Sequence, residues 1–249
     1  MIGDRVDVRT EDGSIDCYLF RPPGEGTWPA VIVYMDAFGI RPELGEMAQR
    51  LASGGYVVAL PNLYYRSGSF PPFDKRAAVV EGPERERFKG MIQSINSAMV
   101  MRDTAAIIEM LDRHPSVDRE ALGVVGYCMG GGYALAAAGT FPDRVAAAAS
   151  FHGGSLATDK ADSPHTFAPR MGATVYVGAA EIDPSFPADQ QARLERALGD
   201  AGVDYTLETY AGAKHGFAVN GHLVYDREAS ERHWTKLMEL FDRTVKKRV

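Results

Sequence analysis

The chain alternates short apolar runs with longer stretches whose apolar residues recur at helical spacing. Residues 30–35 (AVIVYM) form a continuous apolar run, which is typical of a strand buried on both faces. A helical pattern follows over residues 43–53 and stops at two glycines. Further strands are expected at residues 56–60, 145–150, 173–178 and 203–210, and in the run that begins at residue 122. Further helices are expected at residues 95–113, 187–199 and 226–246, and in the stretch that ends near residue 140. This alternation predicts an α/β fold, with a mostly parallel sheet and helices on both of its faces.

The first twenty residues depart from this alternation. Residues 5–10 and 15–20 flank the turn sequence Glu11-Asp12-Gly13-Ser14, which predicts an antiparallel hairpin. We expect the hairpin at one edge of the sheet. Cys17 shares a strand face with Ile15 and Leu19, so it is expected to be a small core residue.

Residues 62–90 show no regular period. They contain several aromatic residues and a charged run from Glu84 to Lys89. A segment of this length inside a compact fold is often a lid over a functional site. A surface excursion with one short helix is the alternative, and the sequence leaves both open.

Composition narrows the class of protein. At 249 residues, one domain spanning residues 1–249 is expected. The formal net charge of −6 disfavours a nucleic-acid partner, and no apolar run approaches the ~18 residues of a membrane helix. The N-terminus has no signal-peptide core, and two cysteines do not make a disulfide scaffold. A cytoplasmic protein with reduced cysteines is therefore expected.

The most specific motif lies in residues 122–135 (LGVVGYCMGGGYAL). It has the form G-x-C-x-G, which is the nucleophile elbow of α/β-hydrolases with cysteine in place of serine. A strand and a helix pass close together at such an elbow, so Gly126 and Gly130 are required because they have no side chains. Cys128 would lie at the helix start, where backbone N–H groups and the helix dipole favour a thiolate. A glycine-rich turn around an inert cysteine is the alternative.

Two other strand ends carry residues that complete a nucleophilic site. Asp183 and His215 follow predicted strands, and the carboxyl ends of parallel strands share one edge of the sheet. The chain order of nucleophile, acid and histidine is that of α/β-hydrolases. His215 is the candidate base and Asp183 the residue that would orient it. His152 is the rival base, because it also follows a strand, and Glu181 is the rival acid.

Acyl transfer also needs donors for the oxyanion. By the rule for this elbow, one is the backbone N–H of Met129, directly after the nucleophile. The other is the backbone N–H of Ala37, in the loop that follows the strand ending at Met35.

With these motifs, the chain resembles the dienelactone hydrolase family of α/β-hydrolases from Ile15 to the last helix. The resemblance rests on the sequences DAFG at 36–39, PNLY at 61–64, GYCMGG at 126–131, DPSFPA at 183–188 and HGF at 215–217. It implies the α/β-hydrolase fold and a triad of Cys128, Asp183 and His215. It also implies hydrolysis of a carboxylic ester or lactone through a cysteine acyl-enzyme, with no metal or organic cofactor.

The chain departs from the family's type enzymes at two positions. Asp36 stands where they have a glutamate that contacts the thiol, which makes Asp36 a candidate for gating its ionisation. Val219 stands where they have an arginine that grips the substrate carboxylate. Arg66, Arg85 or Arg87 could replace that arginine from the aperiodic segment. Residues from these motifs and that segment are the candidate substrate contacts: Phe38, Tyr64, Arg66, Tyr127, His152 and Val219.

The expected partner is thus a small ester or lactone, and the expected assembly is a monomer or weak homodimer. Two alternatives stay open. One is a carboxylesterase or thioesterase that acts on neutral substrates, and the other is a non-catalytic or redox-sensing protein on the same scaffold.

Overall fold

The structure is a computed structural model that describes residues 3–246. Its centre is an eight-stranded sheet in the order β1-β2-β4-β3-β5-β6-β7-β8. The strands are β1 (Asp4–Thr10), β2 (Gly13–Phe20), β3 (Trp28–Tyr34), β4 (Val57–Pro61), β5 (Val117–Tyr127), β6 (Val145–Phe151), β7 (Thr174–Ile182) and β8 (Tyr205–Lys214). The pairs β1–β2 and β2–β4 are antiparallel and all the others are parallel. This confirms the mostly parallel sheet and the hairpin at its edge.

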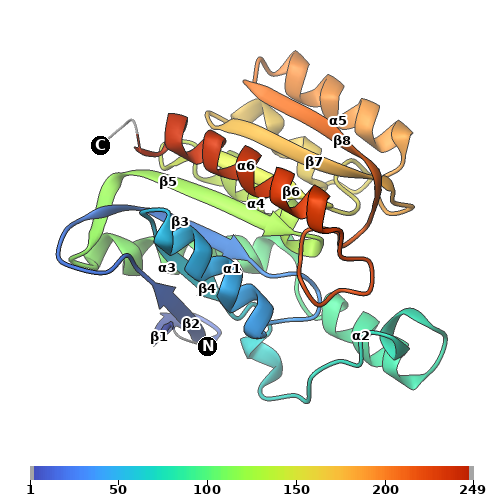
Figure 1. Cartoon of the computed structure of the whole chain (residues 1–249), viewed down its shortest axis with the longest axis horizontal. Coiled ribbons are helices and arrows are strands. Elements are labelled where there is room, and N and C mark those ends of the chain that lie inside the picture. The colour runs from blue at the N-terminus through green and yellow to red at the C-terminus, as the bar shows by residue number, and fades with distance from the viewer. Residues whose placement is uncertain (1–2, 247–249) are drawn as a thin grey trace.

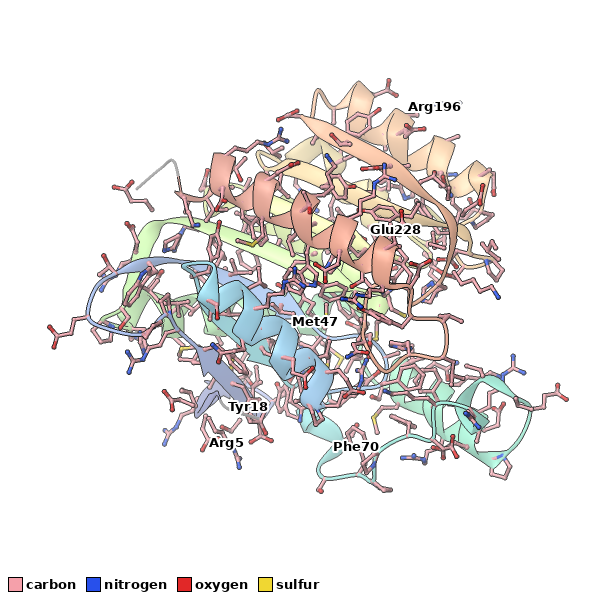
Figure 2. All side chains as sticks on the ribbon, in the orientation of Figure 1. Arg5, Tyr18, Met47, Phe70, Arg196 and Glu228 are labelled. Carbon is pink, nitrogen blue, oxygen red and sulfur yellow. The ribbon has the colours of Figure 1, made fainter. Side chains whose placement is uncertain are left out.

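Helices cover both faces of the sheet. The α-helices are α1 (Pro42–Ser53), α2 (Pro83–Gln93), α3 (Ser97–Arg113), α4 (Met129–Thr140), α5 (Ala188–Asp200) and α6 (Arg227–Thr244), with 3₁₀ turns η1 (Tyr65–Ser67), η2 (Ala77–Val79) and η3 (Pro164–Arg170). Figure 1 shows α1 and α6 in front of the sheet and α3 and α4 behind it. Met47, labelled in Figure 2, is one of the buried residues of α1. Together these layers form the α/β-hydrolase fold.

The central strands are apolar on both sides because helices bury both faces. Val31, Ile32 and Val33 of β3 are completely buried, as are Val124 and Val125 of β5. Continuous apolar runs were therefore sufficient to predict these strands. Within residues 3–246, no helix has the length and apolar character that crossing a membrane requires.

Two predicted boundaries were wrong. β8 continues to Lys214, through residues expected to form a loop, because a bulge in β8 after Tyr210 allows Lys214 to pair with Ile182 of β7. β5 begins at Val117, earlier than the apolar run, because its first residues pair with Trp28 and Pro29 of β3.

The aperiodic segment leaves the sheet after β4 and returns at α3. It contains η1, η2 and one α-helix, α2. In Figure 1, α2 lies beyond the end of the sheet toward which the β5 arrow points. Phe70, labelled in Figure 2, packs against Phe73 with ring centroids 5.6 Å apart. The segment is anchored at Arg66, which pairs with the buried Asp103 of α3 at 2.7 Å.

Close backbone contact between β5 and α4 generates a prediction about stability. A Cβ atom at Gly126 would lie 1.9 Å from the carbonyl oxygen of Gly130, so the two elements would have to separate. We predict that Gly126→Ala lowers the free energy of unfolding by about 3 kcal/mol or more, measured by urea denaturation. Gly90→Ala is the control, because a Cβ at this α2 position meets nothing within 4 Å and should stabilise the helix by up to ~1 kcal/mol. Equal stability of Gly126→Ala and the parent chain would contradict the packing argument.

Candidate active site

Cys128 lies at the turn between β5 and α4. Its backbone has φ +54° and ψ −117°, a region that a residue with a side chain rarely adopts. Gly130 is needed as much as Gly126, because a Cβ there would lie 2.4 Å from the carbonyl oxygen of Tyr34 on β3. The thiol is partly exposed at the start of α4. The local geometry is therefore that of a nucleophile elbow.

The thiol heads a chain of three polar side chains. The Sγ atom of Cys128 lies 3.0 Å from Nε2 of His215, and Nδ1 of His215 lies 2.6 Å from an oxygen of Asp183. His215 follows β8 directly and Asp183 follows β7 directly. Parallel strands thus bring together residues that are up to 87 positions apart in the sequence.

Ser185 completes this arrangement, and sequence reasoning gave it no role. The Asp183 carboxylate accepts the backbone N–H of Ser185 at 2.9 Å and its hydroxyl at 2.6 Å. The same hydroxyl oxygen is 3.2 Å from Nδ1 of His215. Gly154 leaves room for it, because a Cβ there would lie 2.7 Å from Ser185 Oγ. The sequence signal was the spacing D-x-S, in which an aspartate hydrogen-bonds the backbone two residues on.

The hydrogen-bonded side chains of this site shift one another's pKa values. Burial lowers the pKa of His215, but the negative charge of Cys128 and the hydrogen bonds with Asp183 and Cys128 outweigh it and raise the pKa to about 11. Burial raises the pKa of Asp183, but His215 and Ser185 lower it below its usual value on balance. The surroundings of His215 therefore favour its protonated form, and those of Asp183 favour its carboxylate.

Two backbone donors lie beside the thiol. Ala37 and Met129 line the same pocket as Cys128 and His215. Within residues 3–246, neither backbone N–H has a hydrogen-bond partner. The Tyr64 hydroxyl donates to the carbonyl oxygen of Ala37 at 3.0 Å and holds this loop in place. Tyr64 is fully buried, so it supports the loop and does not line the pocket.

The pocket has a volume of about 580 Å³. The lining includes residues 92–97, where α2 ends and α3 begins, and residues from 154–164. None of residues 62–90, the aperiodic segment, lines this pocket. A second hollow of about 670 Å³ borders Phe38 and Phe73, but Cys128 and His215 do not line it. Among residues 3–246, no cluster of three or more His, Cys, Asp or Glu side chains is arranged to hold a metal ion.

Asp36 is engaged away from the thiol. Its carboxylate accepts both terminal nitrogens of Arg41 at 2.6 Å and lies 3.0 Å from Nε2 of His222. Its other contact is the backbone N–H of Phe38. Burial raises its pKa, but His222 and Arg41 hold the pKa well below its usual range. None of the hydrogen bonds that Asp36 makes within residues 3–246 goes to Cys128, and its contacts hold the loop that carries Ala37.

The remaining candidate substrate contacts also lie outside the pocket. Tyr127 is buried and its hydroxyl is 3.1 Å from His233, and Val219 is fully buried. Arg66 is occupied by Asp12 and Asp103. Phe38 stacks on Phe88 of α2 with centroids 4.7 Å apart. Tyr127 and Val219 are thus directed into the core, Arg66 into salt bridges, and Phe38 toward α2 and the second hollow, none of which the spacing in the sequence could reveal.

His152, the rival base, lies next to His215. Its ring is fully buried, 5.4 Å from the His215 ring, and within residues 3–246 neither of its nitrogens has a partner. Burial and the charge of His215 hold the pKa of His152 well below its usual value. It contacts neither Cys128 nor the pocket in the part of the chain that the structure describes. The rival acid, Glu181, accepts the backbone N–H of Gly212 instead.

Comparison with known proteins identifies the family of the chain. The sequence profile of the dienelactone hydrolase family matches residues 15–245. A Synechocystis protein provisionally named carboxymethylenebutenolidase is 30% identical over 244 residues, which cover 97% of this chain and 96% of that protein. A Bradyrhizobium protein provisionally named 2-oxo-3-(5-oxofuran-2-ylidene)propanoate lactonase is 28% identical over 239 residues, which cover 94% and 92% of the two chains.

The fold can be compared with a solved structure. The crystal structure of a Klebsiella pneumoniae protein, provisionally named a dienelactone hydrolase, matches with a TM-score of 0.85 at 24% identity. The match covers 97% of this chain and 98% of that one. The chain therefore belongs to the dienelactone hydrolase family and is a carboxylic ester hydrolase of the dienelactone hydrolase type.

Proposed function

We propose that the chain hydrolyses a carboxylic ester or lactone by nucleophilic catalysis, with Cys128 as the nucleophile, His215 as the acid and base, and Asp183 as the residue that orients His215. The observation that carries this proposal is the hydrogen-bonded chain Cys128–His215–Asp183, which opens into a pocket with two unpartnered N–H groups.

The first half of the reaction forms an acyl-enzyme. The Cys128 thiolate attacks the acyl carbon, and the resulting oxyanion accepts the N–H groups of Ala37 and Met129. The tetrahedral intermediate collapses, the carbon–oxygen bond of the ester breaks, and protonated His215 gives its proton to the departing alkoxide or enolate. A thioester on Cys128 and a neutral imidazole remain.

The second half uses the altered charge of the site. The thiolate makes the largest contribution that raises the His215 pKa, so acylation removes that contribution and lowers the pKa. His215 can then take a proton from water, which attacks the thioester. Collapse of the second intermediate releases the carboxylic acid and restores the thiolate–imidazolium pair.

A sensor function is less well supported. Redox sensing commonly uses a second thiol to resolve the oxidised one. The only other cysteine of the chain, Cys17, is fully buried on β2, where burial raises its pKa to about 12. The pocket and its two free N–H donors have no role in such a sensor but are required for acyl transfer.

Substitution of the nucleophile tests this mechanism. We predict that Cys128→Ala lowers kcat/KM for an aryl acetate by roughly 10³-fold or more, because no other group can form the acyl-enzyme. Cys128→Ser is the matched control, since it keeps the size of the side chain and retains a weaker nucleophile. Both variants should unfold at the same urea concentration as the parent chain. Undiminished turnover by Cys128→Ala would exclude Cys128 as the nucleophile.

The charge coupling gives a second prediction. Replacing Cys128 with alanine removes the negative charge that raises the pKa of His215, so this pKa should fall well below about 11. We expect an NMR titration of the His215 Cε1–H signal to show that fall, with the imidazolium lost at lower pH than in the parent chain. His114 and His165 serve as internal controls, whereas His152 is excluded because the charge of His215 affects its pKa. An unchanged His215 titration would show that Cys128 and His215 do not share a charge.

A further inference from the structure

The active-site pocket contains few charged groups apart from the reacting ones. Its walls present one cation, Lys160, and one anion, Asp162, besides Cys128 and His215. Lys160 and Asp162 are two residues apart on the same exposed loop. Their charges are opposite, so this wall adds no net charge to the pocket.

Three arginines near the site are occupied by carboxylates of the chain, and Arg85, for which the structure gives no ion pair within residues 3–246, does not line the pocket. Arg41 is paired with Asp36, Arg66 with Asp103, and Arg87 with Glu84. Among the residues that line the pocket within 3–246 there is no arginine. A carboxylate that entered would lose hydration without gaining the bidentate partner that compensates for it.

The rest of the lining suits an uncharged molecule. Ile92, Ile95 and Tyr133 give apolar surface. Ser97 also lines the pocket, and its buried hydroxyl has no hydrogen-bond partner among residues 3–246. Apart from Lys160 and Asp162, the side chains that these walls add are apolar or neutral polar, which suits a neutral ligand.

The N-terminus of α3 does not supply a binding site for a substrate carboxylate either. A helix N-terminus attracts anions through its free N–H groups. Here the side-chain oxygen of Asn96 already accepts the N–H of Met99 at 3.0 Å, so the first turn of α3 is capped from within the chain.

We propose that the substrate is an uncharged ester or lactone, with the part beyond the reacting carbonyl lying against Ile92, Ile95 and Tyr133. This rests on the proposed function, because the pocket is defined by Cys128 and His215. A preference for an uncharged substrate would distinguish this chain from enzymes that recognise a carboxylate group on their lactone substrate.

A matched pair of lactones tests the proposal. One carries a free carboxylate, as a dienelactone does, and the other has a primary carboxamide of the same shape in its place. We expect kcat/KM for the carboxamide to exceed that for the carboxylate by at least ten-fold at neutral pH and 0.15 M salt. Inhibition of aryl acetate hydrolysis by each lactone should show the same order of affinity, which provides a readout independent of lactone turnover. Equal kcat/KM values for the two lactones, or a higher value for the carboxylate, would overturn the proposal.

A gain of charge provides the complementary test. Gln93 is exposed at the pocket wall, and Gln93→Arg should raise the carboxylate-to-carboxamide ratio of kcat/KM at least ten-fold. Gln49→Arg adds the same charge on α1, outside the pocket, and should leave the ratio unchanged. A wild-type preference for the carboxylate that disappears in Lys160→Gln would instead identify Lys160 as the partner of an anionic substrate.

Failure of this inference can be told from failure of the mechanism. If Cys128→Ala retains the turnover of either lactone, the proposed function is wrong. If both lactones require Cys128 but the carboxylate is preferred, the mechanism stands and only the uncharged substrate is excluded.

Discussion

The contact between the backbones of β5 and α4 is the constraint on which the site depends. At Gly126 and Gly130 the two elements, and the neighbouring β3, approach so closely that a single methyl group would overlap a carbonyl oxygen. This approach forces Cys128 into a left-handed conformation at the start of α4. The strain is retained because it holds the thiol above the strand ends, within reach of His215 and the free N–H groups.

Charge is distributed unevenly between the site and its surroundings. The site itself joins the Cys128 thiol, the His215 imidazole and the Asp183 carboxylate through two contacts at hydrogen-bond distance. The strong cation nearby, Arg41, is neutralised by Asp36, and this pair with His222 fixes the loop that carries Ala37. Phe38 of the same loop stacks on Phe88 of α2. The aperiodic segment therefore supports the loop that carries Ala37, and residues 92–97, which follow the segment, line the pocket.

Much of the fold and of the candidate site could be predicted from the sequence, because the patterns that indicate them are local. Buried parallel strands appear as continuous apolar runs, and the elbow appears as glycines two positions before and after a cysteine. Asp183 and His215 could be chosen because each directly follows a strand. The partners of Asp36 could not be predicted, because His222 is 186 positions away. The same applies to Tyr127 and Val219, whose directions are set by packing against α6 and the core, and to Phe38, whose partner is in a segment without a period.

The most direct measurement is identification of the covalent intermediate. Rapid acid quenching during turnover of a slowly deacylated ester, followed by intact-mass and peptide mass spectrometry, would locate the acyl group. The mechanism predicts a mass increase equal to that group on the peptide containing Cys128, forming and decaying at rates that account for kcat. An acyl group on another residue, or turnover with Cys128 unmodified at every quench time, would contradict it.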